Sequence, residues 1–228
     1  MLVAGTTGSG KTVALKCMFE GIISIYKNYP HIYKFILIDP KSVEFSQYKN
    51  SPFTSFFSDS VEESIQHLRH LVTVMNFRLK ELFPYVANRS GKSCSNYLEY
   101  FNITLNDSEL FAKLEPMNII IIDELADLIL TDKDLEKPLC LLAQKGRAAG
   151  IHLIVATQRP SADVVTGLIK ANLPAKLCMR VSTKLDARVI FGSQSFGAEQ
   201  LFGTGDMLFL SPEKSEPVRL QGPYIQAR

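Results

Sequence analysis

The chain has 228 residues, of which 46% are hydrophobic and 21% charged, and its mean hydropathy is +0.06. This length and composition are typical of an ordinary globular protein with one sizeable core, and they exclude the disordered and fibrous classes. A formal net charge of +2 permits contact with nucleic acid without arguing for it. Any site for a polyanion must therefore come from the local placement of residues.

The chain begins with a short apolar run, Met1 to Ala4, followed by GTTGSGKT and then by a helical stripe of apolar residues over 13–25. The turn therefore lies between a predicted strand and a predicted helix. Its spacing, G-x-x-x-x-G-K-T, is that of a phosphate-binding loop whose backbone N–H groups curl around a polyphosphate. The predicted nucleotide-binding residues are Gly5, Thr6, Thr7, Gly8, Ser9, Gly10, Lys11, Thr12 and Val13.

Within that loop we expect Lys11 to reach the β and γ phosphates of ATP and the Thr12 hydroxyl to bind Mg²⁺. The N-terminus of the following helix adds a partial positive charge to the same site. The alternative is a flexible Gly/Ser/Thr turn with an incidental lysine. The flanking strand and helix favour the nucleotide site.

The predicted elements that follow alternate between strands and helices. Lys34 to Asp39 is a continuous apolar run that ends in an acid, and 61–82 repeats apolar residues at helical spacing. From Phe83 to Asp107 the pattern breaks, which indicates an irregular surface excursion. Met117 to Ile122 is the next predicted strand.

Lys133 to Ala149 has helical spacing and is followed by Gly150, a common stop signal. Further strands are predicted at 151–156, 175–181 and 207–210. Strands separated by helices imply parallel βαβ units, so we predict an α/β fold with three layers, α/β/α, around a mainly parallel sheet. No internal repeat or linker divides the chain.

Two acids follow the isoleucine-rich strand in NIIIIDEL. Asp123 would lie at the carboxyl edge of the sheet, beside the phosphate loop, where it could hold the Mg²⁺ shell. Glu124 is then placed to accept a proton from an attacking water. The alternative is that the two acids only cap the next helix, which they could also do.

Polar residues also end two other predicted strands. Thr157 and Gln158 would emerge at the same sheet edge, where Gln158 could sense the γ-phosphate, although simple strand termination explains them equally well. Asp39 and Lys41 could pair with each other or line the nucleotide or subunit edge.

The cysteines and histidines lack the spacing of a metal site. Scattered cysteines without a C-x-x-C pair indicate reduced, mostly buried thiols and a cytoplasmic location. No apolar run approaches the roughly 20 residues of a membrane span, and no signal peptide opens the chain. The cysteines are Cys17, Cys94, Cys140 and Cys178, and the histidines are His31, His67, His70 and His152.

Five segments together resemble the motor domain of the FtsK/SpoIIIE DNA translocases, in order from Leu2 to about Pro223. They are GTTGSGKT, IDPKSVEF, IIIIDELADL, KGRAAGIHLIVATQRPSADVVTGLIKANLPAKL and GAEQLFGTGDMLFL. The resemblance implies a RecA-like P-loop ATPase that hydrolyses ATP as a hexameric ring around double-stranded DNA. Chromosome segregation or DNA transfer would be its role.

The resemblance also implies particular residues. Arg147, in KGRAAGIH, resembles the arginine that one subunit inserts into the nucleotide site of the next, although a cation near a helix C-terminus is the plainer explanation. Arg188 resembles a second interface arginine. Arg159 and Lys170 resemble basic residues of a DNA-contacting pore loop, where they would touch phosphates; solvated surface charge competes with this role.

The chain departs from the family pattern in two ways. We expect a single motor domain over 1–228, without the upstream membrane segment, linker and ring-forming domain, or the C-terminal winged-helix reader, of longer relatives. The stretch from Phe83 to Leu110 fits the pattern poorly. A secretion-type ATPase of the same superfamily, which moves protein substrates, is the alternative; such sequences generally diverge around TQRPSADVVTGLIKANLP.

Overall fold

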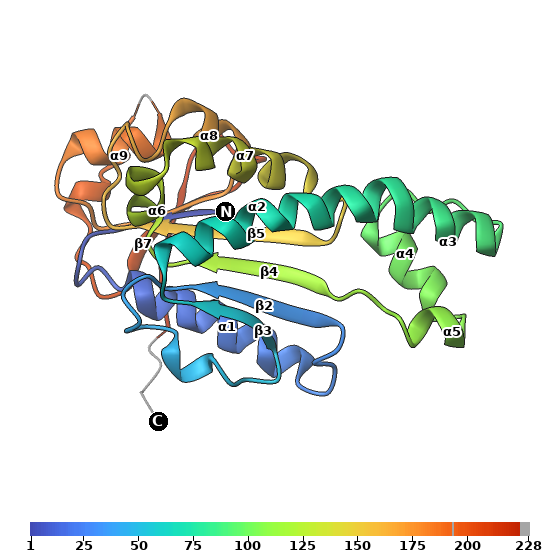
Figure 1. Ribbon diagram of the computed structural model, residues 1–228. Helices are drawn as coiled ribbons and strands as arrows, with labels where there is room; N and C mark the ends of the chain where they lie inside the picture. Colours follow the sequence, from blue (N-terminus) through green and yellow to red (C-terminus); the bar gives the residue numbers. More distant parts are fainter. Residues whose placement is uncertain (193, 224–228) are drawn as a thin grey trace.

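The computed structural model describes residues 1–192 and 194–223, and Figure 1 shows the arrangement of their elements. One eight-stranded sheet runs through this part of the chain in the order β3-β2-β4-β5-β1-β6-β7-β8. The first six strands in that order are parallel, and β7 and β8 are antiparallel to their neighbours. The strands are β1 Leu2–Ala4, β2 Tyr33–Ile38, β3 Thr54–Ser58, β4 Met117–Ile122, β5 Ile151–Thr157, β6 Lys176–Met179, β7 Asp206–Leu210 and β8 Val218–Gln221.

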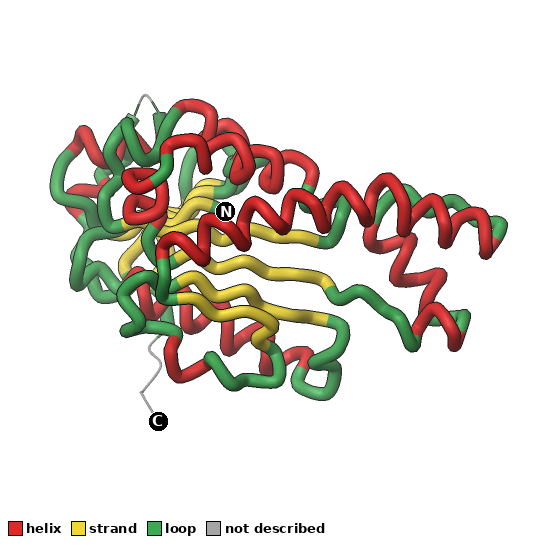
Figure 2. Tube along the Cα trace, in the orientation of Figure 1, coloured by secondary structure: helices red, strands yellow, loops and turns green. Residues whose placement is uncertain are grey.

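Helices cover both faces of the sheet, as the tube in Figure 2 also shows. Helix α1 (Lys11–Tyr26) packs on one face, where its Leu15 and Phe19 join a buried cluster with β2 and β4. The opposite face is covered by α2, α6, α7, α8 and α9, which belong to a second buried cluster. These helices are α2 Val61–Phe77, α6 Leu125–Thr131, α7 Glu136–Lys145, α8 Gly167–Asn172 and α9 Lys184–Phe191. The predicted α/β/α architecture is confirmed.

The interior strands consist almost wholly of apolar residues because both of their faces are covered. Four consecutive isoleucines, 119–122, fill β4, and those at even and odd positions face opposite clusters. This pattern is what a parallel strand buried on both sides requires. The predicted strands at 34–39, 117–122 and 151–156 are therefore found within one residue at each end.

Two strands were missed by the sequence prediction. Strand β3 lies at one edge of the sheet, and β8 lies at the other and is exposed along its length. Edge strands pair on one side only and need no continuous apolar run, so their sequences, TSFFS and VRLQ, carry little periodic signal.

The helix predicted over 133–149 ends early, since α7 stops at Lys145 and a turn leads to Gly150.

The excursion predicted after Phe83 is present, but it is helical, so the prediction of irregular structure is wrong. Helix α2 continues through a π-helical turn, Arg78–Leu82, into α3 (Phe83–Ser90), and α4 (Tyr97–Thr104) and α5 (Ser108–Phe111) fold back against it. We call residues 78–116 the helical extension; it projects beyond the amino ends of β2, β4 and β5 (Figure 1). A separate apolar cluster around Phe83, Tyr97 and Tyr100 stabilises it. Its helices are short, which explains the weak periodicity.

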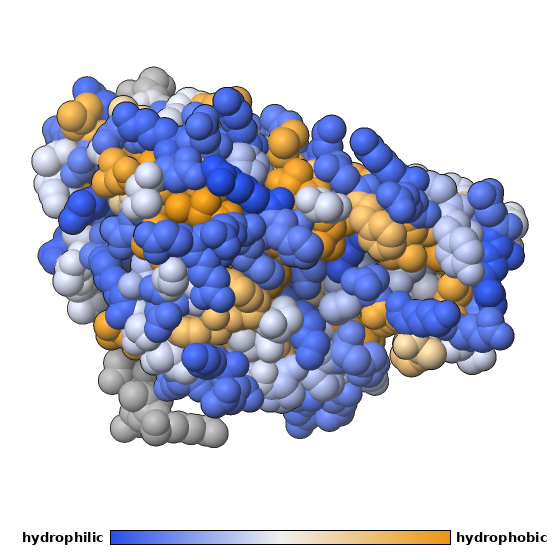
Figure 3. All heavy atoms as spheres, viewed as in Figure 1, coloured by the Kyte–Doolittle hydropathy of each residue, from blue (hydrophilic) through white to orange (hydrophobic). Residues whose placement is uncertain are grey.

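The surface agrees with the composition. The face drawn in Figure 3 is mostly hydrophilic, with apolar side chains gathered in patches between the helices. No helix in the described ranges combines the length and the apolar content needed to cross a bilayer. Three of the four cysteines are buried and Cys17 is partly buried; all four are free thiols.

Candidate nucleotide site

The phosphate-loop motif Gly5–Thr12 follows β1 and runs into the first turn of α1 at the carboxyl end of the sheet. Gly8 and Gly10 have φ values of 79° and 99°, a region that residues with a side chain rarely adopt. A Cβ atom on Gly10 would lie 2.6 Å from the backbone nitrogen of Gly205. Helix α1 has no side-chain cap at its N-terminus, so its first N–H groups are available to an anion. The loop therefore has the backbone of a phosphate cradle.

Lys11 and Asp123 form a buried ion pair next to this loop. The Lys11 Nζ donates to Asp123 Oδ1 and to the Asp123 carbonyl oxygen, both at 2.7 Å, and the two side chains are 3% and 2% exposed. The pair joins the start of α1, which follows β1, to the end of β4, and β5 lies between these two strands in the sheet. The structure thus brings together two residues that lie far apart in the sequence and that were predicted to share a site.

Glu124 lies in a hydrogen-bond network at the end of β5. Its Oε1 accepts from the Thr157 hydroxyl at 2.6 Å, and its Oε2 accepts from the Gln158 backbone N–H at 3.0 Å. Oε1 also accepts from the Ala126 N–H at 3.3 Å, which caps α6. Glu124 therefore caps α6 and also lies beside the phosphate loop. Thr157 positions its carboxylate.

A further contact links this network to the phosphate loop, because the Thr7 hydroxyl donates to Gln158 Oε1 at 2.9 Å. Asp39, by contrast, has a local role: its Oδ2 accepts from the backbone N–H groups of Glu44 and Phe45 at 2.8 and 2.9 Å. Lys41 is exposed, and no ion pair joins it to Asp39 in the described ranges. The suggestion that these two pair is not supported.

Comparison with known proteins assigns this arrangement to a family. The profile of the FtsK/SpoIIIE family matches residues 1–162. The chain belongs to the FtsK/SpoIIIE family. It is 44% identical to a DNA translocase FtsK of Helicobacter pylori strain J99 over 98% of its own length, and 42% identical to one of Bacillus anthracis over 99%. It spans about a quarter of the length of these relatives, 25% and 28% respectively.

Solved structures show the same fold. The pCW3 conjugation coupling protein TcpA, a monomer form with ATPγS, has a TM-score of 0.75 at 26% identity, covering 97% of this chain and 59% of TcpA. The type VII secretion ATPase EccC of Thermomonospora curvata has a TM-score of 0.72 at 21% identity, covering 98% of this chain and 25% of that one. The fold is accordingly that of the P-loop ATPases, and the predicted family resemblance is confirmed.

The FtsK/SpoIIIE segment that carries Arg147 lies far from the phosphate loop. Arg147 is exposed on the turn before β5, whereas Thr157 ends the same strand. A strand of seven residues is about 20 Å long, so Arg147 sits at the amino end of the sheet and does not share the phosphate-loop end. Arg188 is exposed on α9.

The two predicted DNA-contacting residues lie toward different ends of the sheet. Arg159 is exposed just after the carboxyl end of β5. Lys170 is in the last turn of α8, close to the amino end of β6, where burial and the charge of Lys170 lower the pKa of Lys176. The structure brings Lys170 together with Lys176 and leaves Arg159 elsewhere.

Sequence reasoning missed the segment that braces the phosphate loop from the other side. The backbone N–H groups of Thr204 and Gly205 donate to the carbonyl oxygens of Gly8 and Ser9, at 3.4 and 2.9 Å. Asp206 holds this segment through the Phe202 N–H and a bidentate pair with Arg219. The GTGD run that follows Phe202 offered a turn signal, but nothing in it pointed to the loop.

A cavity of about 360 Å³ lies beside this braced loop. Its walls come from the start of α1, the end of β6 and the β7–β8 region, and include Val13, Met179 and Met207. The position is continuous with the phosphate loop through Gly8 and Gly10, and the lining is mainly apolar. A flat, weakly polar group attached to a polyphosphate would fit there.

Proposed function

We propose that this chain is the ATP-hydrolysing motor domain of a DNA translocase. The observation that carries the proposal is the convergence of Lys11, Asp123 and Glu124 at one sheet edge beside an anion-binding loop. In the proposed complex, the loop from Gly5 to Val13 holds the phosphates, and Lys11 neutralises the β and γ oxygens. The adenine and ribose occupy the apolar cavity at the start of α1.

Magnesium fits the oxygen donors at this edge. The described residues contain no cluster of three His, Cys, Asp or Glu side chains able to hold a metal by themselves. A Mg²⁺ ion would therefore take one or two protein ligands, Thr12 and Asp123, and complete its shell with phosphate oxygens and water, as is usual for this ion. When bound, it would neutralise charge on the phosphates.

Glu124 is the proposed general base. The Thr157 hydroxyl and the Gln158 backbone N–H already fix the orientation of its carboxylate. A carboxylate held in this way can accept a proton from a positioned water. The Gln158 side chain, tied to Thr7 of the phosphate loop, is placed to respond to the γ-phosphate. Loss of the γ-phosphate would then change contacts at the end of β5, directly before the segment that carries Arg159.

We further propose a head-to-tail ring, hexameric as in the family expectation. Arg147 lies at the end of the sheet opposite the loop, about 20 Å from the residues that end β5, which supports a role at the site of another molecule. In a heterologous contact, the amino end of the sheet in one chain would meet the carboxyl end of the sheet in the next chain. Repeating this contact generates a ring when the rotation between neighbours closes. Arg188 would lie near the same interface.

Double-stranded DNA is the proposed substrate, and chromosome segregation or DNA transfer the proposed process. The relatives that cover almost the whole chain at 41–44% identity are named DNA translocases. Arg159 and Lys170 would contact phosphates without reading bases, since a motor must accept every sequence that passes. Protein substrates, handled by secretion-type ATPases of the same fold, are the competing possibility.

The test is ATP hydrolysis at increasing protein concentration, with and without long duplex DNA, using Lys11→Ala as the inactive reference. Turnover that rises with both protein and DNA supports an assembling DNA motor. Turnover that rises with protein and ignores DNA contradicts the DNA substrate and leaves the ATPase in place. No turnover above the Lys11→Ala reference contradicts the ATPase itself.

A further inference from the structure

The turn that carries Arg147 is attached to the helical extension through its backbone. This turn, residues 146–150, joins α7 to β5. The Tyr97 N–H donates to the Ala148 carbonyl oxygen at 2.8 Å, and Arg78 Nη1 donates to the Ala149 carbonyl oxygen at 3.0 Å. The carbonyl groups of the two residues that follow Arg147 are therefore both held by residues of the extension.

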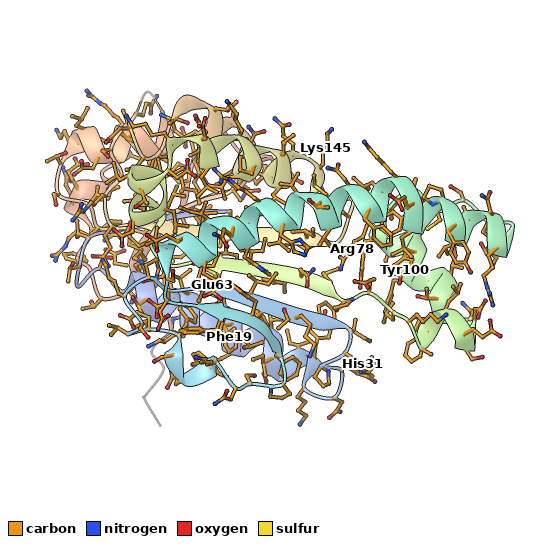
Figure 4. The ribbon with its side chains drawn as sticks, in the orientation of Figure 1. Phe19, His31, Glu63, Arg78, Tyr100 and Lys145 are labelled. Carbon is orange, nitrogen blue, oxygen red and sulfur yellow. The ribbon has the colours of Figure 1, made fainter. Side chains whose placement is uncertain are left out.

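Arg78 is the centre of this attachment. Its side chain is 1% exposed, and Nη2 donates to the Pro116 carbonyl oxygen at 2.9 Å and to Glu115 Oε2 at 3.3 Å. One planar guanidinium thus joins three segments: the π-helical turn that contains it, the loop residues Glu115 and Pro116 at the end of the extension, and the turn of Arg147. Figure 4 shows Arg78 and Tyr100 at the junction between the extension and the sheet.

The contact between the turn and the extension is close. Gly150 has a φ of 73°, and a Cβ atom there would lie 2.3 Å from Cδ2 of Tyr97. The Tyr97 hydroxyl donates to the Glu115 carbonyl oxygen at 2.9 Å, which fixes the ring. The turn therefore packs directly against the ring of Tyr97, a residue of the extension.

Arg147 has little else to hold it. Its side chain is exposed and forms no salt bridge with any described residue. It lies at a groove of about 650 Å³ whose other walls include Gln144 and His152, together with Tyr97 and Phe101 of the extension. The direction in which Arg147 leaves the surface is thus set by the backbone of the turn.

We propose that Arg78 is a positioning residue for Arg147. By fixing the turn 146–150 to the helical extension, Arg78 holds Arg147 in the orientation in which it enters the nucleotide site of a neighbouring copy. This inference rests on the proposed ring, and it assigns the extension a part in ATP turnover. Burying an arginine is unfavourable unless its donors have fixed acceptors, and here the acceptors include the carbonyl oxygens of Ala149 in that turn and of Pro116.

The test uses mixtures of two inactive variants. A Glu124→Gln subunit has an inactive site of its own and still offers Arg147 to its neighbour. An Arg147→Ala subunit has an intact site and offers no arginine. In a one-to-one mixture, about a quarter of the sites in a head-to-tail ring combine an intact site with a neighbour's arginine, so turnover should recover to about that fraction.

Arg78→Met should behave as Arg147→Ala does. Alone, it should lower ATP turnover about 100-fold, the order of effect of a displaced catalytic group, while the affinity for a fluorescent ATP analogue stays within about two-fold. Mixed with Glu124→Gln, it should recover to the same level as the Arg147→Ala mixture. Arg89→Met is the matched control, because Arg89 is an ion-paired arginine of the same extension with no contact to the turn.

The outcomes separate the inference from the function on which it rests. If Arg147→Ala recovers in the mixture and Arg78→Met keeps normal turnover alone, or loses turnover without recovery, Arg78 does not position Arg147. If Arg147→Ala itself fails to recover, both the placement across subunits and the present inference are wrong, and DNA-stimulated turnover of the unaltered chain still decides the ATPase. Circular dichroism checks folding, and the milder Arg78→Lys replaces Arg78→Met if the latter is unfolded.

Discussion

The two ends of the central sheet differ in whether their charged side chains are buried or exposed. At the carboxyl end, Lys11, Asp123 and Glu124 are buried and satisfied by partners within the chain. At the amino end, Arg147 is exposed, and Arg78 holds the turn that carries it through the Ala149 carbonyl oxygen. In the proposed function, the carboxyl end receives the nucleotide and the amino end presents a cation to a neighbouring chain. Such asymmetry suits chains that meet head to tail, since each interface then joins unlike surfaces.

The largest effect should come from removing the base at the carboxyl end. Glu124→Gln keeps the size of the side chain but cannot take a proton, so ATP turnover should fall about 1,000-fold while nucleotide binding remains. Steady-state turnover and equilibrium binding of a fluorescent ATP analogue measure the two quantities separately.

Asp127→Asn is the control for this change. Asp127 is an acid in the first turn of the same helix, α6, and takes no part in the network around Thr157. Its replacement should leave turnover near the level of the unaltered chain. Normal turnover of Glu124→Gln would mean that another group accepts the proton.

The second-largest effect should be on the free energy of unfolding, through the ion pair at the same end of the sheet. Lys11→Ala leaves the Asp123 carboxylate buried without its partner, so the free energy of unfolding should fall by about 3 kcal/mol. Urea unfolding measures the loss. Adding Asp123→Asn should restore much of it, because the unpaired charge is then gone; a double variant no more stable than the single one would contradict a strong coupling between the two residues.

A smaller effect should distinguish the DNA-contacting residues at the two ends. If Lys170 neutralises one phosphate, Lys170→Ala should reduce the slope of log binding constant against log salt by about one, and Arg159→Ala should do the same from the other end. Fluorescence anisotropy with duplex DNA at several salt concentrations measures the slope. Lys113→Ala, in the exposed part of the extension, is the control; a slope unchanged by Lys170→Ala would make that lysine ordinary surface charge.

The smallest expected effect is a pH dependence of stability that comes from His67, away from both ends of the sheet. His67 stacks on Phe56 with ring centroids 3.7 Å apart, and burial, followed by the nearby His70, lowers its pKa below 6.5. The unfolded chain then binds the proton more readily, so the stability contribution is full above pH 6.5 and is lost as the pH falls toward the lowered pKa. His67→Phe should lose less stability on acidification than the unaltered chain; equal losses in urea titrations at pH 7.5 and 5.5 would contradict this.

The carboxyl end could be predicted from sequence because its parts are local. The phosphate loop is contiguous, and Asp123 and Glu124 follow an apolar run that marks a buried parallel strand. Parallel strands place their carboxyl ends at one edge, so a correct strand assignment was enough to bring Thr157 and Gln158 beside them. The brace from Thr204 and Gly205 could not be found in this way, since it depends on backbone contacts across the sheet.

The amino end was harder to predict because its structure depends on distant contacts. The helices of the extension are short and pack mainly on one another, so periodicity over a long window is absent. Cap signals were nevertheless present: Asn96 accepts from the Glu99 N–H, and Asp107 accepts from the N–H groups of Glu109 and Leu110. No local pattern indicates that Arg78, 69 residues before Arg147, would be buried against its turn.

The place of β1 in the sheet has a consequence for the order in which the molecule is built during synthesis. Leu2 lies opposite Val155 on one side and Lys176 on the other, so this strand is enclosed only when segments made much later have formed. Such long-range parallel pairing is slow, because a large loop must close before any contact rewards it. A nascent chain that stops short of Met179 carries the whole GTTGSGKT motif on a strand with an open flank. If the chain binds nucleotide as proposed, its affinity for nucleotide should appear only after β6 has been synthesised.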